Sequence, residues 1–316
     1  MNMKKLSTAF LCLFTVFVSS CTSNEEVNGL PGLSINAYIG GPQSRAEKVD
    51  WEENDAIGVF VCDGTIDKPY LGNVDRYTNV AFRHNGKGFI AQNIYLDENL
   101  AEVFAYYPYS GTNNNGMAVP VESNTQTDYL YGHAETPASI TQKNVNIEMK
   151  HALSQVVFKI RKSASYNEGP GLITALKIEN NDAENVFKTT GTIDLSTGQI
   201  TGTSTDGVLA LMPGKQLLLT DAYQAVSSIC LPVSATVGKN IRAVFTIDDR
   251  QFRYEFPVGT TWKPAFRNIY TLTVENSGLE VGGGGTGDGD GGNDDGITIE
   301  PWGANSDSDI SLVPIL

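Results

Sequence analysis

The chain alternates hydrophobic and polar residues over short stretches, and this pattern predicts β-strands along most of its length. In Gln251–Phe256 the even-numbered residues are aromatic, whereas the odd-numbered residues are polar. Similar alternation runs through Ser154–Ile160, Ile241–Ile247 and Asn268–Val274. A period of two residues is typical of half-buried antiparallel strands that turn one face toward a core.

Segments with weaker alternation are also predicted to be strands. Further strands are predicted at Ile57–Cys62, Glu102–Tyr107, Val145–Met149, Leu172–Glu179, Val208–Leu211 and Gln216–Thr220. Segments rich in Gly, Asn, Ser and Thr separate them, and Asp248–Arg250 is predicted to be a short hairpin loop. No stretch of a dozen residues keeps the 3.6-residue period of an amphipathic helix. The predicted fold class is therefore all-β, and short strands at this spacing favour antiparallel β-sandwiches.

The first twenty residues have the character of an export signal. Lys4 and Lys5 precede an apolar run, Ala9–Val18, which is too short to be a stable membrane anchor. Small residues then lead into Cys21, as they do at the cleavage site of a bacterial lipoprotein. We therefore expect the signal peptide, residues 1–20, to be removed and Cys21 to carry lipid. The alternative is an ordinary signal peptide followed by a chance cysteine.

Composition divides the rest of the chain. A turn-rich stretch near residue 168 predicts a boundary between an N-terminal domain, 46–168, and a C-terminal domain, 169–281. Residues 282–296 are nearly all Gly and Asp, so we expect a flexible spacer there. Residues 297–316 become apolar again, which is unusual because exposed strand-forming tails promote aggregation.

Charge and motifs argue against an enzyme or a nucleic-acid partner. The formal net charge is -14, which disfavours phosphate binding. The three histidines, His84, His133 and His151, lack the spacing to Cys or carboxylates that zinc sites use. No nucleophile motif is present. We expect no catalytic residue, cofactor or metal, and we interpret His151 as a hydrogen-bonded structural histidine.

Three features leave alternatives open. Cys62 and Cys230 are interpreted as buried small hydrophobic residues, with a disulfide between them as the alternative. Asp288–Asp295 fit a solvated spacer, with calcium binding as the alternative, although Ile299 stands where an EF-hand loop needs glutamate. The aromatic residues within 104–109 fit core packing, with a sugar-stacking platform as the alternative.

Several of these features occur together in one known family. The chain resembles the fimbrillin family, the subunits of type V pili. The matching features are the lipoprotein site at Cys21, the later Arg45, the W-x-x-x-D-x-I-G-V-F pattern of Trp51–Phe60, AYYPY at Ala105–Tyr109, HALSQVVFKI at His151–Ile160, NIYTLTV at Asn268–Val274, and Trp302. The resemblance runs over most of the chain. It implies two tandem transthyretin-like antiparallel β-sandwich domains.

The resemblance also implies a route of assembly. The precursor would reach the cell outer membrane as a lipoprotein, and an Arg-specific surface protease would cut between Arg45 and Ala46. That cut would release the propeptide, residues 21–45, with a strand at Leu33–Ile39 that fills a groove in its own subunit. The expected role is a fimbrial subunit that polymerises by strand exchange and supports cell adhesion.

The expected donor of a replacement strand is the C-terminal segment, 297–316. Ile310, Leu312 and Leu316 fall on one side of an extended chain there. The implied partners are other copies or related pilin subunits, the protease, and the outer membrane through lipid, with a host or bacterial surface ligand left open. The alternative function is a glycan-binding lipoprotein that stays anchored, in which Arg45 is only a solvated loop residue.

Overall fold

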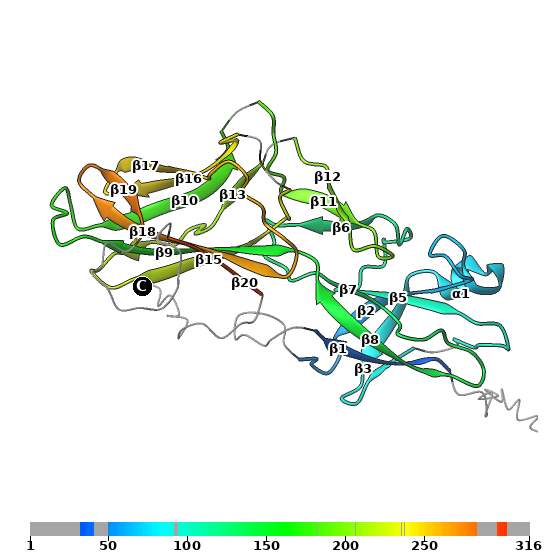
Figure 1. Ribbon diagram of the computed structural model, residues 1–316. Coiled ribbons are helices and arrows are strands. Elements are labelled where there is room, and N and C mark those ends of the chain that lie inside the picture. The colour runs from blue at the N-terminus through cyan, green and yellow to red at the C-terminus, as the bar shows by residue number, and fades with distance from the viewer. Residues whose placement is uncertain are drawn as a thin grey trace, which may run out of the picture. The chain divides into compact units, whose positions relative to one another are not determined.

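Strands account for nearly all the regular structure. The computed structural model describes residues 32–40, 50–91, 94–181, 183–205, 207–234, 236, 238–282 and 296–301. Within these ranges the helical elements are the single turns η1 (Tyr70–Gly72) and α1 (Val74–Tyr77) (Figure 1). The all-β class predicted from the sequence is confirmed.

The strands follow one another along the whole described chain. They are β1 (Ser34–Ile39), β2 (Ala56–Cys62), β3 (Val80–His84), β4 (Phe89–Ile90), β5 (Glu102–Tyr107), β6 (Val119–Glu122), β7 (Leu130–His133), β8 (Asn144–His151), β9 (Ser154–Lys162), β10 (Leu172–Asn180), β11 (Thr190–Ile193), β12 (Ile200–Gly202), β13 (Val208–Ala210), β14 (Leu217–Leu218), β15 (Gln224–Cys230), β16 (Ile241–Ile247), β17 (Arg250–Glu255), β18 (Phe266–Glu275), β19 (Gly278–Val281) and β20 (Ile297–Pro301).

A closed barrel surrounds the first hydrophobic core. Among the described residues its strand order is β1-β4-β3-β2-β5-β7-β8. Neighbouring strands pair antiparallel, except that β1 runs parallel to β8. Ile35, Phe82 and Ile147 are fully buried in this core. Among the described strands, β1 closes the ring, because it joins β8 to β4.

A sandwich encloses the second core. One sheet has the order β13-β10-β16-β17, with β14 beside β10, and the other has the order β15-β9-β18-β19. Phe158 of β9 and Phe245 of β16 meet edge to face across this core, with ring centroids 5.2 Å apart. Trp262 is also fully buried there, and its indole N–H donates a hydrogen bond to the Tyr270 hydroxyl at 2.8 Å.

The division of the chain at residue 168 stays a prediction, as does the tandem transthyretin-like arrangement. β9 lies before that residue in the sequence, yet it pairs with β15 and β18, which lie after it. A small sheet of β12, β11 and β6 likewise joins strands from both sides of residue 168. Its apolar side chains, among them Val119 and Ile193, pack with Phe60 and Phe104 of the barrel strands in a third cluster.

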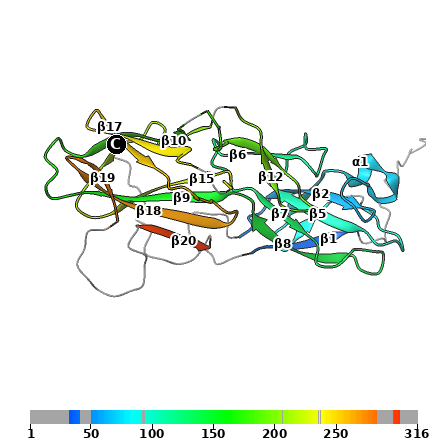
Figure 2. The same ribbon diagram turned by 45° about the horizontal axis from the view of Figure 1, so that its top comes forward.

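One edge of β18 is covered by two strands in succession. β19 pairs with Leu272–Glu275, and β20 pairs with Phe266–Tyr270. Between them, the Thr271 N–H donates to the Gly296 carbonyl, and the Gly282 N–H donates to the Thr271 carbonyl. Figures 1 and 2 both show β20 beside β18. The first residues of the expected C-terminal donor segment therefore lie on their own subunit's sheet.

The hairpin between β16 and β17 is tighter than the predicted loop. The turn holds only Asp248 and Asp249, because Arg250 already pairs with Ile247. Both aspartates have positive φ angles, 48° and 62°, which two-residue hairpin turns of type I′ require. Asp tolerates this left-handed conformation better than most residues, which explains why an acidic pair stands at the turn.

Candidate functional site

Strand β1 pairs with β8 along its whole length. Its residues pair in register with β8, from Ser34 opposite Asn144 to Ile39 opposite Met149. At its two ends the Leu33 N–H donates to the Ile94 carbonyl at 3.1 Å, and the Gly40 N–H donates to the Met149 carbonyl at 2.9 Å. These bonds make β1 a full member of the barrel.

The apolar face of β1 contributes to the barrel core. Leu33, Ile35 and Ala37 are 2%, 0% and 7% exposed, whereas Asn36 and Tyr38 on the other face lie at the surface. Burial of Leu33 and Ile35 stabilises the closed barrel by about 1.5–3 kcal/mol each. Without β1, these apolar sites and the facing backbone groups of β8 would be open to another strand.

Trp51 ties β1 to the segment that follows it. Its indole N–H donates a hydrogen bond to the Ala37 carbonyl at 2.8 Å. Its ring packs edge to face on Phe89 and Tyr107, with centroids 4.9 Å and 5.5 Å away. The tryptophan of the W-x-x-x-D-x-I-G-V-F pattern thus contacts the strand that is predicted to be removable.

The residues expected to process and exchange this strand lie outside the described part of the chain. They are the lipidation site Cys21, the cleavage site Arg45–Ala46, and the donor residues Ile310, Leu312 and Leu316. Asp288–Asp295 and Trp302 lie outside it as well. These assignments stay predictions.

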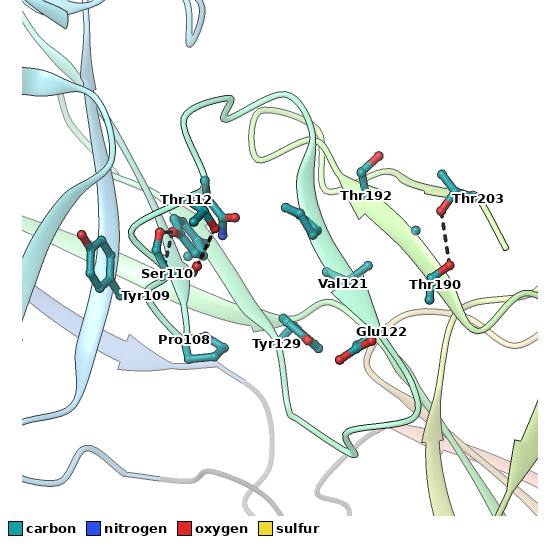
Figure 3. A pocket seen from close by; sticks show the side chains of 14 residues that line it. Pro108, Tyr109, Ser110, Thr112, Val121, Glu122, Tyr129, Thr190, Thr192 and Thr203 are labelled. Carbon is teal, nitrogen blue, oxygen red and sulfur yellow. Dashed lines mark hydrogen bonds between the residues drawn. The ribbon is translucent and has the colours of Figure 1, made fainter. Parts of the chain in front are cut away.

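A pocket opens between the end of β5 and the small sheet of β6, β11 and β12. Its volume is about 570 Å³. Figure 3 shows Tyr109, Ser110 and Thr112 on one side and Thr190, Thr192 and Thr203 on the other. Glu122 and Tyr129 also line it.

A close approach between β2 and β5 positions the first wall. Gly58 faces Tyr106 across the two strands, and a Cβ at Gly58 would lie 2.1 Å from the Tyr106 ring, so only glycine fits. The Tyr106 hydroxyl donates to Asn79 Oδ1 at 2.8 Å and accepts from the Ser110 N–H at 3.1 Å. Burial raises the pKa of Tyr106, so the phenol stays protonated at neutral pH. These contacts hold the 106–113 segment in place.

Strand register sets the second wall. Glu122 of β6 pairs with Thr190 of β11, and Pro120 pairs with Thr192, so these four side chains share one face of the small sheet. The Thr203 hydroxyl lies 3.3 Å from that of Thr190. The opposite face carries the apolar residues of the third cluster.

The buried polar residues singled out in the sequence have structural roles. His151 Nδ1 lies 3.0 Å from Asp128 Oδ1 in a buried pair, which confirms a hydrogen-bonded structural histidine. Cys62 and Cys230 are buried and unpaired, as predicted. Burial raises the pKa of Cys62 to about 12 and raises that of Cys230 too, so neither is a reactive thiolate at neutral pH.

Within the described ranges, no group of three or more His, Cys, Asp or Glu side chains could hold a metal ion. None of the helices in those ranges has the length and apolar character needed to cross a bilayer.

The sequence pointed to only half of the pocket. The aromatic run at 104–109 raised a sugar-stacking platform as an alternative to core packing. In the structure Phe104 and Tyr106 are core residues, whereas Tyr109 is half-buried and lines the pocket. The sequence did not mark Thr190, Thr192 or Glu122 as site residues, because threonine-rich strands are common on the solvent-exposed face of a sheet.

The fold resembles that of two solved structures from Bacteroides. The crystal structure of a putative cell adhesion protein from Bacteroides uniformis superposes with a TM-score of 0.59 at 22% identity, over 85% of this chain and 98% of that one. A second such structure, from Bacteroides ovatus, gives a TM-score of 0.60 at 18% identity, over 87% and 98%.

Sequence comparison places the chain more narrowly. The fimbrillin-like family matches residues 44–302, and the chain belongs to this family. "Putative fimbrium subunit Fim1C" of Bacteroides uniformis is 28% identical over 302 residues, which cover 88% of this chain and 93% of that protein. These matches support a pilus-subunit role at the cell surface, in assembly with other pilin subunits, rather than an enzymatic role.

Proposed function

We propose that the chain is a fimbrial subunit that polymerises by exchange of strand β1. The observation that carries the proposal is the position of β1 in the barrel, between β8 and β4. This strand closes the barrel, and Arg45 follows it in the sequence. Ile35 of the strand and Leu33, the residue just before it, are buried in the barrel core. A strand that completes a core and is followed by a protease site can be removed after folding.

The proposed sequence of events begins with export. Lipid on Cys21 holds the precursor at the outer membrane, and an Arg-specific surface protease then cuts between Arg45 and Ala46. Once β1 leaves, the exposed backbone of β8 and the apolar sites of the barrel accept a strand from a second subunit. Ile310, Leu312 and Leu316 supply the apolar side chains of that donor. The subunit then belongs to the fimbrium and supports cell adhesion.

Replacement of Arg45 tests this proposal. Arg45→Ala should yield a folded, uncleaved and monomeric precursor, because β1 keeps its seat and blocks a donor strand. Lys48→Ala changes a cation in the same stretch and should polymerise normally. Polymers would be scored as an SDS-resistant ladder on gels and as filaments by electron microscopy. Ladders from Arg45→Ala equal to those of the unaltered chain would reject the proposal.

The alternative is a lipid-anchored glycan-binding lipoprotein, and the pocket beside β6 is the observation that favours it. The N-terminal residue of the protein at the cell surface separates the two functions. Cys21 at that position means an anchored lipoprotein, whereas Ala46 means a processed subunit.

A further inference from the structure

We propose that the pocket between the 106–113 segment and the β6-β11-β12 sheet binds a neutral sugar. The pocket is a different site from the seat of β1, so this inference does not depend on strand exchange. Its volume of about 570 Å³ falls within the range of about 300–1,000 Å³ that is usual for small-ligand sites.

The lining has the two kinds of surface that a pyranose ring needs. A pyranose presents a face of C–H groups and a rim of hydroxyls. The half-buried ring of Tyr129 offers a flat apolar surface for the C–H face. Thr190, Thr192 and Thr112 offer hydroxyls that both donate and accept hydrogen bonds, which suits the rim.

Glu122 supplies the strongest hydrogen-bonding group. An ionised carboxylate accepts two hydrogen bonds in a fork, which matches two neighbouring sugar hydroxyls. Within the described part of the chain, the Glu122 carboxylate and the Tyr129 hydroxyl have no hydrogen-bond partner. These groups are therefore available to a ligand.

The charge of the lining selects against other ligands. None of the residues that line the pocket is Lys, Arg or His. The negative charge of Glu122 would therefore repel a phosphate or carboxylate ligand, and no cationic side chain of the lining would offset this repulsion. A cationic amine would pair with the single carboxylate of the lining. The remaining polar side chains are hydroxyls and an amide, which both donate and accept hydrogen bonds, whereas an ammonium group can only donate them. A neutral polyhydroxyl ligand satisfies more of these groups.

Backbone hydrogen bonds also preorganise both walls of the pocket. The Tyr109 N–H donates to the Ala56 carbonyl at 2.9 Å, which fixes the first wall to the start of β2. The Thr203 N–H donates to the Thr190 carbonyl at 2.8 Å, which holds the far side of the second wall. Binding would therefore order few additional residues, and this lowers its entropic cost.

Binding is tested with the full exported chain. The protein would be screened on an array of neutral oligosaccharides that end in galactose, glucose, mannose, fucose or N-acetylhexosamine. The matching free monosaccharide and putrescine would then be titrated by saturation-transfer NMR. We expect at least one neutral sugar to give a saturation-transfer signal that reaches a plateau on titration, and putrescine to give no such signal.

Matched substitutions locate the site. Glu122→Gln and Thr192→Val should each weaken sugar binding about tenfold or more, because each removes a hydrogen bond to the ligand with little change in shape. The controls are Glu280→Gln, at an exposed position of β19, and Thr246→Val, at a half-buried position of β16. Both should bind as the unaltered chain does.

Three results would overturn the proposal. The first is no binding of any neutral sugar in large millimolar excess, and the second is binding of putrescine in place of a sugar. The third is sugar binding that survives both pocket substitutions with equal affinity. A folded state shown by the same melting temperature as the controls ensures that loss of binding reports on the pocket.

Discussion

At the scale of single residues, Asp248 shows how one side chain organises a turn. Its carboxylate accepts hydrogen bonds from the N–H groups of Gly171 and Leu172 and from the Tyr166 hydroxyl, all at 2.8 Å. Burial opposes its ionisation, but these bonds outweigh burial, and the pKa of Asp248 lies below its usual value. The β16–β17 hairpin is thereby joined to the start of β10.

We predict that Asp248→Asn lowers the free energy of unfolding by about 2 kcal/mol at neutral pH. Asn keeps the positive φ angle, so the loss reports on the charge and its bonds. Because the folded-state pKa is depressed, the carboxylate stabilises the fold above its unfolded pKa of about 3.9 and loses this effect as the pH falls through the folded pKa.

Urea unfolding at several pH values measures the effect of Asp248→Asn. The difference from the unaltered chain should shrink as the medium becomes more acidic than about pH 4. Asp249→Asn is the matched control, since Asp249 also has a positive φ angle but is exposed. Equal stability of the two variants at neutral pH would show that the Asp248 bonds do not hold the turn.

At the scale of elements, β1 is the strand on which barrel closure depends. It pairs with β8 over six residues but with β4 over only two, Ser34 and Ile35. Just beyond β4, the Leu33 N–H donates to the Ile94 carbonyl at 3.1 Å. In the proposed exchange of β1, the short ladder leaves few backbone hydrogen bonds to break on the β4 side.

We predict that Ile35→Ala lowers the free energy of unfolding by about 2–5 kcal/mol, because it leaves a cavity in the barrel core. Asn36→Ala, on the exposed face of the same strand, should cost less than about 1 kcal/mol. Guanidinium unfolding of the uncleaved precursor measures both. If the two variants unfold at the same midpoint, β1 does not occupy its seat in solution.

At the scale of the whole molecule, the proposed assembly has each subunit both accept and give a strand. Ordering eight tail residues costs about 1–2 kcal/mol for each residue. Burial of Ile310, Leu312 and Leu316 returns about 1.5–3 kcal/mol each, and each backbone hydrogen bond adds about 1 kcal/mol. The proposed donor would therefore insert as a unit, and burial of its apolar side chains would decide whether it binds.

We predict that deletion of Asp309–Leu316 leaves a folded subunit that accepts a strand but cannot give one. Mixed with intact processed subunits, it should shorten polymers in proportion to its share. Leu312→Asp should act nearly as strongly, whereas Ser311→Asp, which falls on the other side of the strand, should have little effect. Gel ladders and electron microscopy measure polymer length, and normal ladders from the truncated subunit alone would exclude the C-terminus as donor.

The all-β class and many individual strands could be predicted from the amino-acid sequence alone. A period of two is a local property, so β5 was predicted with the bounds that the structure has, and the buried aromatic face of Phe252, Tyr254 and Phe256 was predicted correctly. Strands with weak alternation, such as β6, β7, β11 and β15, were missed because tertiary contacts rather than local pattern make them strands.

Only the tertiary structure decided how the strands combine. Ser34 pairs with Asn144 across a large separation in the sequence, and the parallel direction of β1 beside β8 leaves no local trace in either strand. The pocket arises in the same way, because the pairing of β6 with β11 places Glu122 opposite Thr190. Alternation reports which face of a strand is buried, whereas partner and register depend on the summed contacts of the whole fold.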